Sequence, residues 1–265
     1  MKLSAWQTRY LDLRRDEISE GTELAYRQTF RALRACLGDV VVSRVTADHA
    51  RKFRRQLRGR GLDGNRHLRD ARCIWGWAVR EGVAGTNVFS GLPKSRAPGP
   101  FRYVSVDELA ALRAVAGSWR VLIGVCRLAG LRRGEALRAQ WGDLVADRAG
   151  RSMLNVYAPK TDRSRVVPVV PELRAELHPL RACPYICRVP SNNLKRDANA
   201  IIVRAGLEPW GAFFQSLRKS CESDWLARYP VMDVAGWMGH SPSVSQRYYH
   251  QTTERVWDDV AKGSS

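Results

Sequence analysis

Six polar residues in the second half of the chain carry the side chains that phosphoryl transfer requires. In chain order they are Arg132, Lys160, Gln215, Arg218, His240 and Tyr249. Arginine stays charged and its planar fork can meet two phosphate oxygens, so Arg132 and Arg218 are the candidate clamps for an anionic group. A lone arginine in so basic a chain is normally a surface cation. The ordered set is what predicts a site that breaks and re-forms phosphate esters.

The local sequence favours functional positions for the first two cations. Arg132 follows Ala129-Gly130-Leu131 between two apolar segments, where a turn can direct it inward. Glu135 lies three residues later and is expected to support the guanidinium. Lys160 is expected at the tip of a hairpin, from which a lysine could reach a phosphate and protonate the leaving oxygen.

The last two residues of the set predict a proton carrier and a nucleophile. His240 follows Gly239 at a predicted helix end, and it would hydrogen-bond a phosphate or help to accept a proton. Tyr249 lies nine residues later and is the predicted nucleophile. A free phenol has a pKa near ~10, so attack at neutral pH needs neighbouring cations and a base. Tyr248 is the alternative nucleophile, on a different helical face.

The motifs around these residues resemble those of a known family. They are Gly130-Leu131-Arg132-Arg133-Gly134-Glu135, Lys160-Thr161, Gln215-Ser216-Leu217-Arg218, Met238-Gly239-His240-Ser241 and Tyr249. This ordered set resembles the tyrosine recombinases, which include phage integrases and the Xer and Cre recombinases. One position departs from the family pattern: Gln215 stands where the first residue of His-x-x-Arg is usual. Glutamine can donate a hydrogen bond to phosphate but cannot relay a proton.

The resemblance implies a site-specific DNA recombinase of integrase type. Tyr249 would form a 3′-phosphotyrosyl link and release a 5′-hydroxyl, which conserves the phosphodiester energy and needs neither metal nor ATP. No cofactor and no metal site are therefore expected. The implied partners are double-stranded DNA at specific sites and further copies of the chain, as a homotetramer on two DNA sites. A final predicted helix, about 253–262, is equally compatible with packing on a neighbouring protomer or on its own.

Two other functions stay open at this point. A nicking and closing activity like that of type IB topoisomerases would use the same chemistry without assembling on two sites. A repressor or architectural protein on a scaffold that has lost catalysis is the other alternative, and Gln215 is its only support.

The bulk composition agrees with a polyanionic partner. The chain has 265 residues, 45% of them apolar, a net charge of +18 and a pI near 10.4. Such an excess of positive charge is typical of proteins that bind DNA or RNA. The sequence contains no apolar run of about 20 residues and no signal-peptide core, so we expect a cytoplasmic, nucleoid-associated protein encoded by a bacterium or its virus. The six cysteines lack the spacing of a zinc site and are expected to be reduced.

Helical periodicity and turn signals predict two domains. Residues 1–95 have the pattern of a helical bundle, 96–104 that of a linker, and 105–265 that of a second domain that opens on a capping box at Ser105-Val106-Asp107-Glu108. Short strands are expected near 143–145, 152–157 and 165–169, with helices around them. The predicted fold class is thus mainly α with a small antiparallel β-sheet. It resembles a helical core-binding domain, which clamps DNA, joined to a tyrosine-recombinase catalytic domain.

Details of the first domain are also predicted. Thr22 is the expected N-cap of the second helix. The fourth helix, about 65–80, is expected to carry Arg66, His67, Arg69 and Arg72 on its polar face. Runs of cations usually mark a solvated face, but in a basic two-domain clamp they more plausibly contact phosphates. The residues predicted to contact DNA are Lys52, Arg55, Arg66, Arg69, Asn193, Lys195 and Arg196.

Overall fold

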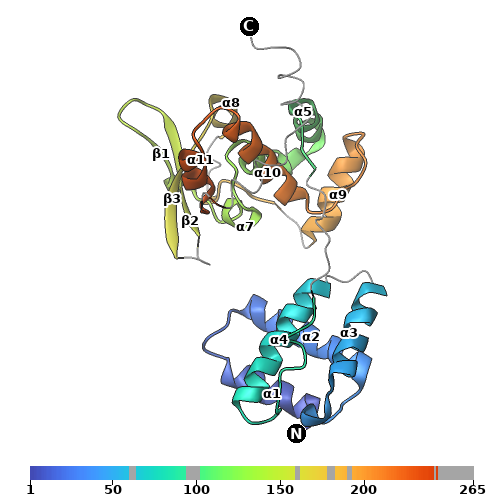
Figure 1. The fold of residues 1–265 in the computed structure, drawn as a ribbon. Coiled ribbons are helices and arrows are strands. Elements are labelled where there is room, and N and C mark those ends of the chain that lie inside the picture. The colour runs from blue at the N-terminus through green and yellow to red at the C-terminus, as the bar shows by residue number, and fades with distance from the viewer. Residues whose placement is uncertain are drawn as a thin grey trace. The chain divides into compact units, whose positions relative to one another are not determined.

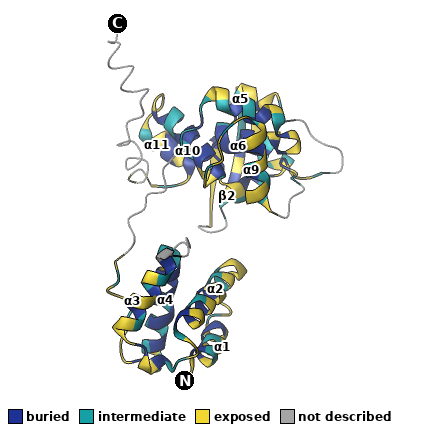
Figure 2. Cartoon of the chain, turned by 90° about the vertical axis from the view of Figure 1, so that its right-hand side faces the viewer, coloured by how far each residue is buried: buried dark blue, intermediate teal, exposed yellow. Residues whose placement is uncertain are grey.

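The computed structural model describes residues 1–59, 64–93, 102–158, 162–177, 183–189, 193–241 and Ser243. The chain separates into two compact units, Met1–Ala97 and Pro98–Ser265. Each has its own cluster of buried apolar side chains, and in Figure 2 the buried faces of the helices turn toward the inside of their own unit. None of the helices in the described part of the chain combines the length and the apolar character needed to span a bilayer.

The first unit is a bundle of helices joined by short loops. Its elements are α1 (Leu3–Leu13), α2 (Glu20–Leu37), a 3₁₀ turn (Val42–Arg44), α3 (Ala47–Gly59) and α4 (Gly64–Arg80). Aromatic side chains fill the space between them. Trp6, Tyr10 and Phe30 are fully buried, and the rings of Trp75 and Phe89 lie 4.7 Å apart between centroids. Large apolar groups at helical spacing therefore form this core, as the sequence pattern predicts.

The predicted N-cap of the second helix is wrong. Helix α2 begins at Glu20, and Ser19 takes the cap position, with its hydroxyl accepting a hydrogen bond from the backbone N of Thr22 at 3.4 Å. Both Ser19 and Thr22 are good capping residues. With Ser19 as cap, the acidic Glu20 and Glu23 occupy the first turn, where the positive end of the helix dipole stabilises them.

The second unit combines helices with one three-stranded sheet (Figure 1). Its elements are α5 (Val106–Val115), a 3₁₀ turn (Gly117–Trp119), α6 (Arg120–Leu128), α7 (Arg133–Ala136), a 3₁₀ turn (Trp141–Asp143), β1 (Leu144–Ala146), β2 (Ser152–Ala158), β3 (Arg163–Pro168), α8 (Pro171–Arg174), α9 (Leu194–Arg204), α10 (Phe213–Leu226) and α11 (Val231–Met238). The capping box at Ser105 and Glu108 is confirmed. So is the fold class, mainly α with a small antiparallel sheet.

The sheet supports one side of this unit. Its strands are antiparallel in the order β1-β2-β3, and Leu154 lies opposite Val167 in the register. Alternation along β3 points Arg165 and Val167 toward the protein interior, whereas Ser164 and Val166 are exposed. Helix α11 packs against β3, and α10 packs against both α6 and α11. Strand β3 and the end of α11 thereby approach the turn that leads into α7.

Candidate functional site

A buried carboxylate lies at the centre of the candidate site. Glu135, in the short helix α7, is 5% exposed and accepts four hydrogen bonds. Arg132 donates from its backbone N at 2.8 Å and from Nη1 at 2.8 Å. Arg165 donates from Nη1 at 3.1 Å and from Nη2 at 2.8 Å. A carboxylate offers about four acceptor positions, so this one is fully used. The expected support of Arg132 by Glu135 is thus present in the geometry.

A tight turn brings Arg132 to this carboxylate. Helix α6 ends at Leu128, and Gly130 adopts a positive φ of 62°. A Cβ at Gly130 would lie 2.8 Å from the sulfur of Met238, so a side chain fits there neither in conformation nor in space. Arg132 then takes the N-cap position of α7, from which its side chain remains 44% exposed.

Three guanidinium groups converge on the C-terminal end of α11. Arg165 Nε donates to the carbonyl of Trp237 at 2.7 Å, Arg218 Nη2 donates to that of Met238, and Arg132 Nη2 donates to that of Gly239 at 3.3 Å. The last carbonyls of a helix have no intrahelical partner and carry the negative end of its dipole. They therefore gather positive side chains from three different elements.

Arg218 is the most enclosed of the three arginines. It comes from α10, is 4% exposed, and also donates from Nη1 to the carbonyl of Gly130. Nη1 lies 3.8 Å from Glu135 Oε2. Burial, together with the nearby charge of Arg132, lowers the pKa of Arg218 to about 10, so the group stays charged at neutral pH.

The charges also determine the state of Glu135. Burial alone would raise its pKa, but hydrogen bonds from Arg165 and from the backbone and side chain of Arg132 outweigh burial and lower the pKa to about 2. The carboxylate is ionised at any physiological pH. Three guanidinium groups share this single carboxylate, which leaves an excess of positive charge at the site.

His240 lies directly after the C-terminal end of α11. Gly239 caps α11 with a φ of 66°, and His240 follows with a side chain that is 14% exposed. Its Nε2 lies 3.0 Å from Oε1 of Glu222, a carboxylate that is 4% exposed. Glu222 stands one helical turn after Arg218 on α10. The imidazole is thereby held by the same helix that carries the buried arginine.

The structure brings together three of the six predicted catalytic positions. Arg132, Arg218 and His240 lie around the end of α11. Gln215 is exposed in the first turn of α10, three residues before Arg218. Lys160 and Tyr249 lie outside the described residues, and so do Tyr248, the turn that carries Lys160 and the predicted helix at about 253–262.

Two residues of this cluster are absent from the set predicted from the sequence. Arg165 falls only within the strand expected near 165–169, and the sequence motifs assign no role to Glu222. Two signals could have pointed to them. Arg165 alternates with the apolar Val167 on the inward face of a predicted strand, and Glu222 follows Arg218 at a spacing of four in a predicted helix.

The cations predicted to contact DNA in the first unit differ in their surroundings. Lys52 and Arg55 are exposed on α3. The side chain of Arg69 is 70% exposed, and that of Arg66 is 28% exposed. The predicted polar face of α4 is wrong at His67, which is 3% exposed because it meets a polar partner on α2 rather than water.

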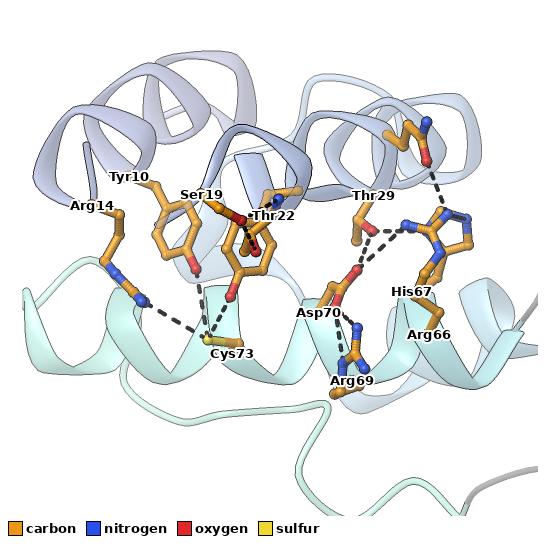
Figure 3. A network of polar contacts seen from close by, with 12 residues as sticks. Tyr10, Arg14, Ser19, Thr22, Thr29, Arg66, His67, Arg69, Asp70 and Cys73 are labelled. Atoms are coloured by element: carbon orange, nitrogen blue, oxygen red, sulfur yellow. Dashed lines mark hydrogen bonds and ion pairs between the residues drawn. The ribbon is translucent and has the colours of Figure 1, made fainter. Parts of the chain in front are cut away.

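That partner belongs to a buried polar network between α2 and α4 (Figure 3). The hydroxyl of Thr29 hydrogen-bonds Nδ1 of His67 at 2.8 Å and donates to Asp70 Oδ2 at 3.3 Å. Nη2 of Arg66 lies 3.1 Å from His67 Nε2, and Arg69 donates twice to Asp70 Oδ1, at 3.2 and 3.1 Å. The buried Asp70 thus orients the two arginines that begin this helix.

The predicted contacts in the second unit gather at the start of α9. Asn193 is its N-cap, and its side-chain oxygen accepts from the backbone N of Arg196 at 3.1 Å. Lys195 and Arg196 are exposed, and Arg196 is paired with Asp197 at 2.8 Å. The cap fixes the helix start, and both cations face solvent.

Comparison with known proteins identifies the fold. No model of a protein family matches the chain, and a search of curated proteins finds no match. Solved structures do match. A crystal structure of a lambda integrase dimer bound to a COC′ core site has a TM-score of 0.78 and 17% sequence identity, over 94% of this chain and 77% of that one.

Two further structures support the same conclusion. A lambda integrase tetramer bound to a Holliday junction has a TM-score of 0.75 and 17% identity, over 91% of this chain and 78% of that one. The Tn1549 transposon integrase in complex with circular intermediate DNA has a TM-score of 0.71 and 16% identity, over 98% and 99%. The chain has the fold of these integrases, which confirms the fold that the sequence resemblance implies.

Proposed function

We propose that this chain, which has an integrase fold, is a tyrosine site-specific recombinase that cuts and rejoins DNA strands. The observation that carries the proposal is the cluster of three guanidinium groups around Glu135, next to His240. Arg132 and Arg218 are the residues that the sequence motifs single out as phosphate clamps, and both belong to this cluster.

The charge balance of the cluster favours an anionic ligand. Glu135 and Glu222 together carry at most two negative charges against the three of Arg132, Arg165 and Arg218, so the cluster keeps a net positive charge. Arg132 is the half-exposed member through which a ligand is reached. A guanidinium has five N–H donors, and the hydrogen bonds of Arg218 to the carbonyls of Gly130 and Met238 leave others for phosphate oxygens. A phosphodiester supplies both the charge and the paired oxygens that this arrangement suits.

In the proposed reaction the phenol oxygen of Tyr249 attacks the scissile phosphorus. A P–O bond to the tyrosine forms while the bond to the 5′ oxygen breaks. Arg132 and Arg218 stabilise the charge that develops on the non-bridging oxygens. His240, oriented by Glu222, hydrogen-bonds the phosphate or helps to accept the phenol proton, and Lys160 delivers a proton to the leaving oxygen. The reverse attack by a 5′-hydroxyl rejoins a strand.

The same proposal covers the assembly. Residues 1–95 would grip DNA through Lys52, Arg55, Arg66 and Arg69, and α9 would add contacts from Asn193, Lys195 and Arg196. Four protomers would act on two DNA sites in the cytoplasm. Support comes from the lambda integrase of the same fold, which has been crystallised as a tetramer on a Holliday junction.

A covalent-trapping experiment tests the function. Nicked suicide duplexes from the DNA that flanks the gene are incubated with the full chain, and protein–DNA adduct is scored on denaturing gels. Wild type should form a 3′-linked adduct, and Tyr249→Phe should bind DNA without forming it. Tyr248→Phe is the matched control and should react. Adduct formed by Tyr249→Phe, or lost only in Tyr248→Phe, would refute the choice of nucleophile. Specific binding without any adduct would favour a DNA-binding scaffold that has lost catalysis.

A further inference from the structure

Arg165 joins three elements of the candidate site through one side chain. It projects inward from β3, donates through both terminal nitrogens to Glu135 in α7, and donates through Nε to the carbonyl of Trp237 in α11. The side chain is 9% exposed. Each of its three nitrogens donates a hydrogen bond to another element, so Arg165 is placed to hold these groups together.

The backbone beside it is shaped to admit this side chain. A Cβ at Gly239 would lie 2.8 Å from Cδ of Arg165 and 3.1 Å from its Nε, and the φ of 66° at Gly239 is unfavourable for other residues. Because Gly239 has no side chain, the side chain of Arg165 has room to pass beside the turn at Gly239. That turn carries His240 as its next residue.

The side chain also fixes strand β3, which begins three residues after Lys160 in the sequence. Strand β3 begins at Arg163, and Arg165 lies opposite Val156 of β2 in the register. Because Arg165 is tied to α7 and α11, the β2–β3 hairpin has a fixed position against the His240 turn. A lysine could not make these contacts, since one ammonium cannot bond two carboxylate oxygens and a carbonyl in the plane that a guanidinium spans.

We infer that Arg165 is a positioning residue for the proposed phosphoryl transfer, an inference that rests on the proposed function. It holds Glu135, and through Glu135 it orients Arg132. It also fixes the His240 turn relative to the hairpin. Loss of Arg165 should therefore slow strand cleavage while leaving DNA affinity nearly unchanged.

The electrostatic surroundings of Glu135 give a readout that a purely structural anchor would not affect. The charged groups facing Glu135 are Arg132 from its own turn, Arg165 from β3 and Arg218 from α10, and the thiol of Cys126 on α6 interacts with it. Removal of Arg165 takes away two of the four hydrogen bonds that lower the pKa of Glu135. The pKa should rise, and the pH below which cleavage is lost should rise with it.

The test is single-turnover adduct formation at saturating protein across pH, with Arg165→Met and Arg165→Lys. Arg165→Met should cleave on the order of tenfold to a hundredfold more slowly, because a misplacement of catalytic groups by about 1 Å can cost about a hundredfold in rate. Its DNA dissociation constant should stay within about twofold. The acid limb of its pH–rate profile, which is the range where cleavage is lost as the pH falls, should move to higher pH. Arg165→Lys should keep the acid limb near that of wild type, because the positive charge is retained. It should nevertheless cleave slowly, because the planar guanidinium with its paired donors is lost.

Controls separate the possible failures. Arg151→Met removes an exposed arginine that pairs with Asp147 at the other hairpin, and it should behave as wild type. Gly239→Ala should reproduce the slow cleavage by displacing Arg165 without changing its charge. If Arg165→Met does not fold, Arg165→Lys and Gly239→Ala decide the outcome. Wild-type rates with an unmoved acid limb would overturn the role of Arg165, whereas absence of any wild-type adduct would instead defeat the proposed function.

Discussion

Replacing Glu135 with glutamine should destabilise the second unit by about 3 kcal/mol at neutral pH. The carboxylate has a pKa of about 2 in the folded protein against an ordinary value of 4.5. One pKa unit corresponds to about 1.4 kcal/mol, so the depressed pKa is equivalent to about 3 kcal/mol of stability. The side chain is only 3% exposed, so solvent screening takes little of this away. Glutamine would also turn N–H donors toward Arg132 or Arg165, which need acceptors.

The pH dependence of this effect has a definite sign. A carboxylate with a depressed folded pKa stabilises the folded state fully at pH values above 4.5, and the contribution is lost as the pH falls toward about 2. The difference between wild type and Glu135→Gln should therefore be largest at pH 7. At pH 3 it should be less than half of its neutral value.

Urea-dependent hydrogen exchange of α10 peptides measures this difference, because these amides report unfolding of the second unit alone. Asp197→Asn is the matched control in the same unit, since Asp197 pairs with the exposed Arg196 on α9 and such surface pairs contribute at most about 1 kcal/mol. A loss below about 1 kcal/mol for Glu135→Gln at pH 7, or an equal loss at pH 7 and pH 3, would refute the view that the arginines stabilise this carboxylate.

The remaining predictions concern activity and binding. Arg132→Ala should slow single-turnover cleavage on the order of a hundredfold, because a contact that strengthens in the transition state is lost. A near wild-type rate would mean that Arg132 is an ordinary surface cation without a catalytic role. Gln215→Ala should slow cleavage only modestly, since a neutral hydrogen bond contributes roughly 0.5–1.5 kcal/mol, and complete inactivity would contradict this. Binding isotherms at several salt concentrations should show affinity falling steeply with salt, and Arg69→Ala should reduce that slope by about one, whereas an unchanged slope would remove Arg69 from the DNA contacts.

The sequence determined the elements that depend on local patterns. Apolar residues at helical spacing predicted the helices of the first unit, and the capping box at Ser105 and Glu108 was readable because both partners lie within one turn. The order and setting of the six polar residues, Arg132, Lys160, Gln215, Arg218, His240 and Tyr249, led to the prediction of the chemistry. Glu135 was predicted to support Arg132 for the same reason, since a spacing of three residues in a helix is a local contact.

Only the tertiary structure decided which distant residues complete the site. Arg165 reaches Glu135 across thirty residues of sequence and Arg218 reaches Gly130 across eighty-eight, and no period or spacing encodes such pairs. Burial of His67 has the same origin. Helical periodicity assigns a residue to a face, but the polar partner that α2 presents to that face exists only once the helices pack. The meeting of three guanidinium groups around Glu135 is likewise a property of the packed chain. It arises from side chains of α7, β3 and α10 that come together at the end of α11.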